Sequence, residues 1–422
     1  METCVSIGRG LGTFLHAISG KYRRLVARNL RIATAPAPPS PADLENLVRE
    51  TFRRGGANFL ASLKTQIMPV ADLAKQIDPE GLRLLGRNRL EGRGTVVAMA
   101  HMGNWEALTR LGALVLETGT YGGVYRPLDN PLMDELTRSR RTSTGAMLFS
   151  RKDGYYSPSS FLREGGALAV LGDQRAGARG TAMPFLGKNT TCPPLLEMMA
   201  KRGRARIVTL EMRTTGPGQW LLALHPLREK ADTAEIMAAL ESILRSSLPD
   251  VFWFHDRWTT NAQYPLSLFT KLDPEMAATA TVPLRLVLTT PPQTPEDSVQ
   301  AFLSRMFEIR PDLRIERLTC PGARSTNPAV ILHDWDSEAP EMFAEALIKQ
   351  VDADFPTPID GFLLFGAEVS LAKAARRMGH KVILGFDVKG KPWSRSLPLP
   401  GSLDEWARLP DDMNFMPKRH QS

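Results

Sequence analysis

The organisation of this chain is clearest at residues 95–106, which read Thr95-Val96-Val97-Ala98-Met99-Ala100-His101-Met102-Gly103-Asn104-Trp105-Glu106. The first six residues form an apolar run long enough for a buried strand, whereas Gly103 and Asn104 interrupt both strand and helix patterns. His101 is therefore predicted to lie on the turn where a strand ends. In open α/β sheets, functional sites lie at the carboxyl ends of the strands.

A short helix is predicted to follow this turn. Asn104 is placed to cap a helix that begins at Trp105, so the Glu106 carboxylate lies in its first turn, near the positive helix end. We expect His101 and Glu106 to lie close together. In such a pair the neutral imidazole accepts a proton from an attacking hydroxyl, and the carboxylate fixes its tautomer and stabilises the imidazolium. A buried structural histidine is the alternative interpretation of this spacing.

Further motifs follow this one in a fixed order along the chain. They are Gly123-Val124-Tyr125-Arg126-Pro127, Asn130-Pro131 with a basic helix over 132–141, Leu171-Gly172-Asp173-Gln174, Met183-Pro184-Phe185-Leu186-Gly187 and Phe252-Trp253-Phe254-His255-Asp256-Arg257-Trp258. Together with an early Arg28-Asn29-Leu30, this order over residues 20–262 resembles the lipid A biosynthesis lauroyl/myristoyl acyltransferase family of the lysophospholipid acyltransferase superfamily. The resemblance implies an α/β fold with a glycerolipid-acyltransferase-like mixed sheet flanked by helices.

The resemblance also implies an activity, which is O-acyl transfer from an acyl thioester of acyl carrier protein to a hydroxyl of a lipid A precursor. His101 would be the general base and Glu106 its paired carboxylate, with direct attack on the thioester and no covalent enzyme intermediate. No metal and no organic cofactor is expected. The alternatives are a phospholipid acyltransferase that accepts a glycerol phosphate lipid, a thioesterase that activates water, and a non-catalytic lipid- or saccharide-binding protein.

Six residues of the motifs are candidates for substrate binding: Arg126, Asp173, Asn104, Tyr125, Phe185 and Arg257. The guanidinium of Arg126 suits a phosphate or a developing oxyanion, and a surface ion pair is the alternative. Asp173 either orients Arg126 or the acceptor's phosphate-bearing sugar, or it caps the following loop. By resemblance Phe185 lies beside the acyl pocket. Arg257 lies among aromatic residues suited to an interface, or else in a buried aromatic cluster.

The charge balance points to an acidic partner or surface. The net charge is +8, and residues 1–31 hold six basic side chains against the single acid Glu2. Segment 1–40 is therefore predicted to be a basic amphipathic segment that associates with an anionic membrane leaflet, with a solvated helix as the alternative. The resemblance implies the cytoplasmic face of the inner membrane, with peripheral or N-terminally anchored attachment. No run approaches the ~18 apolar residues that span a bilayer, so peripheral attachment is expected.

Other partners and compartments follow from composition. An acidic acyl carrier protein would suit the basic charge equally well. Nucleic acid is not expected, because only 7% of residues are aromatic and no recognition module is visible. The three cysteines are far apart, which indicates a reducing compartment without a disulfide framework.

The second half of the chain has a different pattern. After an acyltransferase domain over 41–270, strands and helices alternate within 281–410 and predict a smaller parallel Rossmann-like domain. The expected strands are 284–289, 313–318, 329–333, 362–365 and 382–386, and the expected helices are 296–308, 339–351 and 370–378.

The motifs of this C-terminal region resemble the N-terminal half of lipopolysaccharide heptosyltransferases. The resemblance is carried by Val287-Leu288-Thr289-Thr290-Pro291, by 310–315 and by 374–386. The Gly-Asp pair that normally precedes the threonine-proline turn is missing, so we expect recognition of the acceptor's saccharide rather than catalysis. An unrelated Rossmann-like domain is the alternative.

Overall fold

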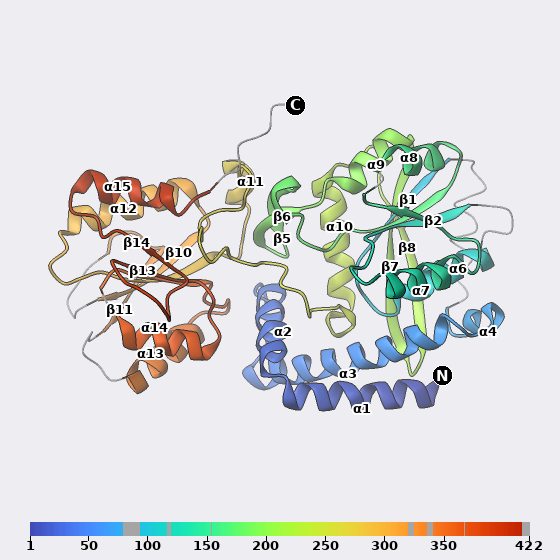
Figure 1. The fold of residues 1–422 in the computed structure, drawn as a ribbon, viewed down its shortest axis with the longest axis horizontal. Helices are drawn as coiled ribbons and strands as arrows, with labels where there is room; N and C mark the ends of the chain where they lie inside the picture. The colour runs from blue at the N-terminus through green and yellow to red at the C-terminus, as the bar shows by residue number, and fades with distance from the viewer. Residues whose placement is uncertain are drawn as a thin grey trace. The chain divides into compact units, whose positions relative to one another are not determined.

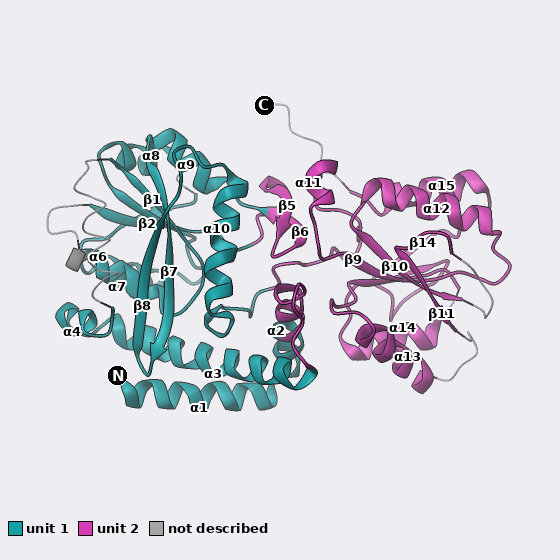
Figure 2. Cartoon of the chain, turned by 180° about the vertical axis from the view of Figure 1, so that it is seen from behind, with its two compact units in different colours: residues 1–26, 41–174, 192–255 teal, residues 27–40, 175–191, 256–422 magenta. Residues whose placement is uncertain are grey.

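The computed structural model describes residues 1–78, 93–115, 120–152, 154–319, 325–335, 341–366 and 368–415. These residues form two compact units (Figure 2). Unit 1 comprises 1–26, 41–174 and 192–255, and unit 2 comprises 27–40, 175–191 and 256–422. Unit 2 thus includes two segments from the N-terminal half of the chain.

Unit 1 is built on a mixed six-stranded sheet in the order β3-β2-β4-β1-β7-β8 (Figure 1). Its strands are β1 Thr95–Met99, β2 Tyr121–Tyr125, β3 Met147–Ser150, β4 Ala167–Leu171, β7 Arg206–Gly216 and β8 Gln219–Pro226. All neighbouring strands are parallel except β7 and β8. This sheet, flanked by helices, confirms the predicted fold class.

The described helices of unit 1 are distributed along its whole length. They are α1 Glu2–Ile18, the first half of α2 Gly20–Ala33, α3 Pro41–Thr65, α4 Val70–Ala74, η1 Trp105–Ala107, α6 Leu108–Val115, α7 Pro131–Thr142, α8 Tyr156–Arg163, α9 Leu195–Gly203, α10 Thr233–Ser246 and η3 Leu248–Asp250.

Strand β1 is central to the sheet and buried on both faces. Its residues Val97 and Met99 share one core with Ala61 of α3 and Leu111 of α6. Because side chains alternate along a strand, Val96 and Ala98 face the opposite side, and α9 and α10 also contact β1. Burial on both faces explains why this strand is a continuous apolar run in the sequence.

Helices α1 and α3 lie side by side and antiparallel, in backbone contact through glycines (Figure 1). A Cβ atom on Gly12 would lie 2.1 Å from the carbonyl oxygen of Phe52, and one on Gly8 would lie 2.5 Å from that of Gly56. Arg9 also donates two hydrogen bonds of 3.0 Å to the carboxylate of Glu50. The pair therefore tolerates no side chain at its closest points.

Unit 2 is built on a parallel sheet in the order β11-β10-β9-β12-β13-β14. Its strands are β9 Leu284–Thr289, β10 Leu313–Thr319, β11 Val330–Asp334, β12 Gly361–Leu364, β13 Ile383–Phe386 and β14 Arg395–Leu397. Counted along this sheet the order is 3-2-1-4-5-6, which is that of a doubly wound Rossmann fold. The predicted Rossmann-like architecture is therefore present.

The helices of this sheet also match the predicted pattern. They are α12 Glu296–Ile309, α13 Glu341–Ala353, α14 Val369–Met378 and α15 Leu403–Asp412, together with α11 Pro274–Ala278 and η2 Gly177–Arg179 elsewhere in the unit. Strand β14 and helix α15 extend the fold beyond the predicted elements, and positions 339 and 340 of one predicted helix lie outside the described residues. A two-stranded sheet of β5 Thr181–Phe185 and β6 Lys188–Cys192 completes the set.

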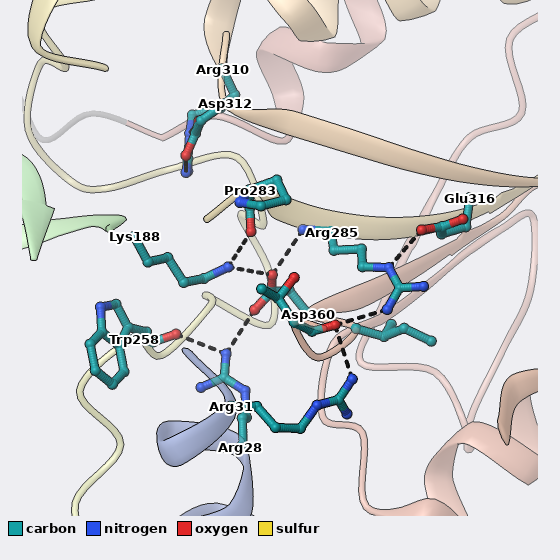
Figure 3. A network of polar contacts seen from close by, with 12 residues as sticks. Arg28, Arg31, Lys188, Trp258, Pro283, Arg285, Arg310, Asp312, Glu316 and Asp360 are labelled. Carbon is teal, nitrogen blue, oxygen red and sulfur yellow. Dashed lines mark hydrogen bonds and ion pairs between the residues drawn. The ribbon is translucent and has the colours of Figure 1, made fainter. Parts of the chain in front are cut away.

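Ion pairs and hydrogen bonds of charged side chains connect segment 27–40 to the rest of unit 2 (Figure 3). The fully buried Asp360 carboxylate accepts hydrogen bonds of 2.8 Å from Arg28 and 2.7 Å from Lys188. Arg31 likewise pairs with Asp352 at 2.5 Å. Burial alone would raise the pKa of Asp360, but the Lys188 and Arg28 charges hold it below its usual value. Two of the six basic side chains expected at a membrane surface are thus paired inside this unit.

Candidate active site

His101 and Asp173 meet because their strands are parallel neighbours in register. Met99 of β1 is paired with Leu171 of β4, so both residues lie two positions beyond their strand ends. His101 Nδ1 is 2.7 Å from Asp173 Oδ1, and the His101 backbone N–H donates to Asp173 Oδ2 over 3.0 Å. One carboxylate therefore fixes both the backbone and the ring of the histidine.

The protonation state of the pair follows from its surroundings. Burial alone would raise the pKa of Asp173, but the His101 charge and hydrogen bond, with His255 nearby, hold it below its usual value. An ionised carboxylate only accepts hydrogen bonds, so in the neutral ring of His101 the proton lies on Nδ1 and Nε2 holds a lone pair. The side-chain amide nitrogen of Gln174 lies 3.5 Å from this Nε2.

The basicity of His101 is increased by the same arrangement. Burial lowers the pKa of the imidazole, but the charge and hydrogen bond of Asp173, with a smaller contribution from Glu106, raise it above 6.5 overall. The side chain is 16% exposed, against 2% for Asp173. The pair thus presents one accessible basic nitrogen in front of a buried anion.

The turn after β1 is held in place by its backbone. Gly103 has φ +60°, and a Cβ atom there would lie 2.2 Å from the carbonyl oxygen of Met212. The Gly103 N–H donates to the Asp250 carbonyl over 3.0 Å, and the Phe252 N–H donates to the His101 carbonyl over 2.8 Å. This rigid turn needs glycine and fixes the direction of the imidazole.

Glu106 does not make the predicted hydrogen bond to His101. It lies in η1 and accepts a bidentate pair from Arg141 of α7, at 2.6 Å from Nη2 and 3.0 Å from Nε. The reason is geometric. Strand β4 is the parallel neighbour of β1 and brings Asp173 directly beside the imidazole. Glu106 follows His101 by five residues in η1, where it binds Arg141 instead. Glu106 still acts on His101 through its charge, which raises the pKa of the histidine.

Removing Arg141 tests this arrangement. In Arg141→Met we expect kcat/KM to fall by roughly ten- to a hundredfold, because Glu106 loses two charge-assisted hydrogen bonds. Since the Arg141 charge lowers the pKa of His101, the acidic limb of the pH–rate profile should also move to higher pH. Arg140→Met is the matched control on the same helix, since among the described residues the Arg140 side chain hydrogen-bonds only Gln66, at 3.5 Å. Equal losses in both variants would contradict the assignment.

Asn104 occupies the N-cap position of η1, but its side chain makes no capping hydrogen bond, so that part of the prediction is wrong. The amide is buried and donates to Thr65 Oγ1 over 3.3 Å, because the turn directs it toward α3 instead. Its Oδ1 atom has no hydrogen-bond partner within the described part of the chain.

Tyr125 and Arg126 lie where β2 ends. Tyr125 is buried, and its hydroxyl accepts a hydrogen bond of 3.3 Å from Arg138 of α7. Arg126 is exposed and makes no hydrogen bond or ion pair with any described residue. The predicted orientation of Arg126 by Asp173 is not present, because both carboxylate oxygens of Asp173 bind His101.

Phe185 and Arg257 come together in unit 2. The Arg257 guanidinium lies 4.6 Å from the centroid of the Phe185 ring and donates to Thr190 Oγ1 over 3.0 Å. Trp258 Nε1 donates to the Phe185 carbonyl over 3.2 Å. Phe185 and Arg257 are each 1% exposed, which matches the buried aromatic cluster given as the alternative for Arg257.

Aromatic rings that the sequence interpretation did not assign to the site surround His101. Trp105 lies edge-on at 5.3 Å between ring centroids and His255 at 6.3 Å. Phe252 extends the group, at 5.8 Å from Trp105. The aromatic run that begins at Phe252 was visible in the sequence, but nothing in its pattern indicated which residue it contacts.

A histidine–carboxylate pair beyond the ends of parallel strands is typical of the active sites of α/β enzymes. Comparison with known families makes this specific, because residues 2–260 match the model of the bacterial lipid A biosynthesis acyltransferases. The chain belongs to this family, and it is an acyltransferase of lipid A biosynthesis. The matched residues end before the parallel sheet of unit 2 begins.

Individual relatives agree with the family match. The chain is 24% identical over 273 residues to the lipid A biosynthesis palmitoleoyltransferase of Escherichia coli (strain K12), covering 62% of this chain and 87% of that protein. It is 24% identical over 268 residues to the lauroyltransferase of the same strain, covering 61% and 85%. A lipid A biosynthesis acyltransferase of Haemophilus influenzae is 31% identical over 150 residues, or 35% of this chain and 46% of the relative.

Proposed function

We propose that this enzyme transfers a fatty acyl chain from an acyl carrier protein thioester to a hydroxyl of a lipid A precursor, with His101 as general base. The observation that carries the proposal is the His101–Asp173 pair, in which Nδ1 faces the buried carboxylate and the partly exposed ring keeps Nε2 for the acceptor. Asp173 takes the orienting role that the sequence interpretation gave to Glu106. Glu106, held by Arg141, adds negative charge that favours the imidazolium.

The chemical steps follow from these positions. Nε2 of His101 accepts the proton of the acceptor hydroxyl as its oxygen attacks the thioester carbonyl carbon. The resulting tetrahedral intermediate expels the thiolate, which takes the proton back from the imidazolium. Asp173 stays ionised throughout and stabilises the imidazolium, so its role is electrostatic and orienting. The exposed guanidinium of Arg126 suits an anionic group of the acceptor or of the carrier protein.

The activity is tested with the purified full chain. Acyl carrier protein and coenzyme A thioesters are offered with a lipid A precursor, with a glycerol phosphate lipid, or with no acceptor, and the products are analysed by mass spectrometry. We expect the lipid A precursor to gain the mass of one acyl group. Acylation of the glycerol phosphate lipid alone, or acyl release that is independent of acceptor, would contradict the proposed function.

We also propose that α1 attaches the enzyme to the inner membrane at its cytoplasmic face. One side of α1 carries five exposed apolar side chains, which are Ile7, Leu11, Phe14, Leu15 and Ile18. Their spacing of three, four and seven residues places them along one stripe of the helix. Lys21 and Arg24 are exposed just beyond and suit anionic lipid. Among the described helices none is long and apolar enough to cross a bilayer.

A single substitution tests this attachment. Phe14 is 59% exposed, so Phe14→Glu removes apolar area without disturbing a core. We expect roughly a tenfold or greater loss of binding to anionic phospholipid vesicles in cosedimentation, because burying a phenylalanine contributes about 1.5–3 kcal/mol. Ser6→Glu, exposed on the polar side of the same helix, adds the same charge and should bind nearly as well as the unsubstituted protein. Equal loss of vesicle binding in both variants would contradict membrane attachment through this apolar stripe.

A further inference from the structure

Unit 2 contains a pocket that includes neither His101 nor Asp173. It is open to solvent, and about 320 Å³ of empty space lies at the site, a volume that includes open solvent. Its lining residues come from two segments of this unit, 175–191 and 256–422, and include the three cations Arg175, Lys188 and Arg310 and no carboxylate. The wall is thus cationic and polar, with hydroxyl groups interspersed.

Two of the three cations form ion pairs with carboxylates that do not line the pocket. Lys188 pairs with Asp360 at 2.7 Å, and Arg310 makes a bidentate pair with Asp312 at 2.8 Å for both contacts (Figure 3). Both cations are 3% exposed, so their positions are fixed by burial and by these partners. The uncompensated positive charge of the pocket therefore lies elsewhere.

That charge belongs to Arg175. Its Nη2 atom is buried and has no hydrogen-bond partner within the described part of the chain, and its guanidinium lies 6.0 Å from the centre of the Phe269 ring. Burial and the nearby Arg257 charge lower its pKa, while Asp256 raises it, but a guanidinium remains protonated at neutral pH. A buried donor without an acceptor is costly, and a bound anion would remove that cost.

A second polar atom on the wall also lacks a partner. Asn189 is 4% exposed, and its Nδ2 donates to the Ala277 carbonyl over 3.4 Å. Its Oδ1 has no donor among the described residues. The pocket thus offers a charged donor in Arg175 and a neutral acceptor in Asn189, which together suit a ligand that has both an anionic oxygen and a hydroxyl.

We propose that this pocket binds a phosphate-type oxyanion, which accepts hydrogen bonds from Arg175 while a P–OH or neighbouring hydroxyl of the ligand donates to Asn189. The planar guanidinium matches two phosphate oxygens, and such charge-assisted bonds are about twice as strong as neutral ones. The ligand chemistry is that of a phosphomonoester or of free phosphate. This inference is independent of the acyl transfer reaction, since it rests on unit 2 alone.

The test is a titration of the full chain by isothermal calorimetry in phosphate-free buffer. One arm uses inorganic phosphate, and the other uses a short-chain, water-soluble phosphatidate as a phosphorylated lipid headgroup. We expect Arg175→Gln to weaken binding roughly tenfold or more in at least one arm, and Arg175→Lys to weaken it less because the charge remains. Arg179→Gln removes an equal charge from an exposed position of the same segment and should bind normally.

Each outcome decides the proposal. Binding of phosphate that depends on Arg175 supports a site for free phosphate, and binding of phosphatidate alone with the same dependence supports a headgroup site. No binding in either arm, or equal weakening by Arg175→Gln and Arg179→Gln, would overturn the proposal. Circular dichroism of each variant confirms that it is folded before titration.

Discussion

Asp173→Asn is expected to lower kcat for acyl transfer by roughly a thousandfold. The asparagine keeps the shape of the carboxylate, but it no longer stabilises the imidazolium. Its amide nitrogen would also face Nδ1 of His101 or the backbone N–H that Asp173 now satisfies. The ring would then favour the tautomer protonated on Nε2, which cannot accept a proton from the acceptor. Steady-state kinetics with saturating thioester measure the effect.

Two comparisons make this prediction specific. His101→Gln should lose about as much activity, and the double variant should lose no more than either single one, because the two residues act as a unit. Glu106→Gln should lose much less, since Glu106 acts on His101 only through its charge. A Glu106→Gln enzyme that is as impaired as Asp173→Asn would contradict the assignment of Asp173 as the partner of His101.

Gly12→Leu is expected to reduce the stability of unit 1 by about 3 kcal/mol, at the upper end of what overpacking costs. The new Cβ would lie 2.1 Å from the carbonyl oxygen of Phe52, and this contact is with backbone that cannot rotate away. Helices α1 and α3 would have to separate along their glycine contact. Thermal unfolding followed by circular dichroism should show a Tm lower by roughly 6–12 °C.

The same helix supplies a matched control for this prediction. Gly10 lies in α1 with nothing within 4 Å of its Cβ position, so Gly10→Leu adds the same side chain in open space. Leucine favours helix over glycine by up to about 1 kcal/mol, so this variant should be slightly stabilised. If Gly12→Leu melts at the same temperature as Gly10→Leu, the helices are not in the close contact described.

Five of the six strands of the unit 2 sheet were predictable from the sequence, and so was β1 of the unit 1 sheet. Strands buried on both faces are continuous apolar runs, so β1 and β9 were located to within a residue. The composition of the two units was not predictable. Segment 27–40 belongs to unit 2 through pairs such as Arg28–Asp360, whose partners are separated by 332 residues, and no local pattern indicates such a contact.

The candidate site was predicted in part. The end of an apolar strand located His101, and Asp173 was a candidate from its motif, but their contact depends on β1 lying beside β4 rather than beside β2, which follows it in the chain. Strand order is a property of the whole sheet, so the sequence interpretation paired His101 with the nearer Glu106. It also could not distinguish an interfacial Arg257 from a buried one, because an arginine among aromatic rings suits both environments.

The central claim is that Asp173 holds His101 as a general base. The most direct measurement is an NMR titration of the ¹⁵N-labelled imidazoles in the unsubstituted full chain and in Asp173→Asn, with His101 assigned through His101→Gln. We expect the pKa of His101 to lie above its ordinary value of 6.5 when Asp173 is present and to be clearly lower in Asp173→Asn. In the neutral ring we expect the proton on Nδ1. Since only the neutral ring accepts a proton, activity should fall as the pH drops through that raised pKa. A pKa that is the same in both proteins would contradict the claim.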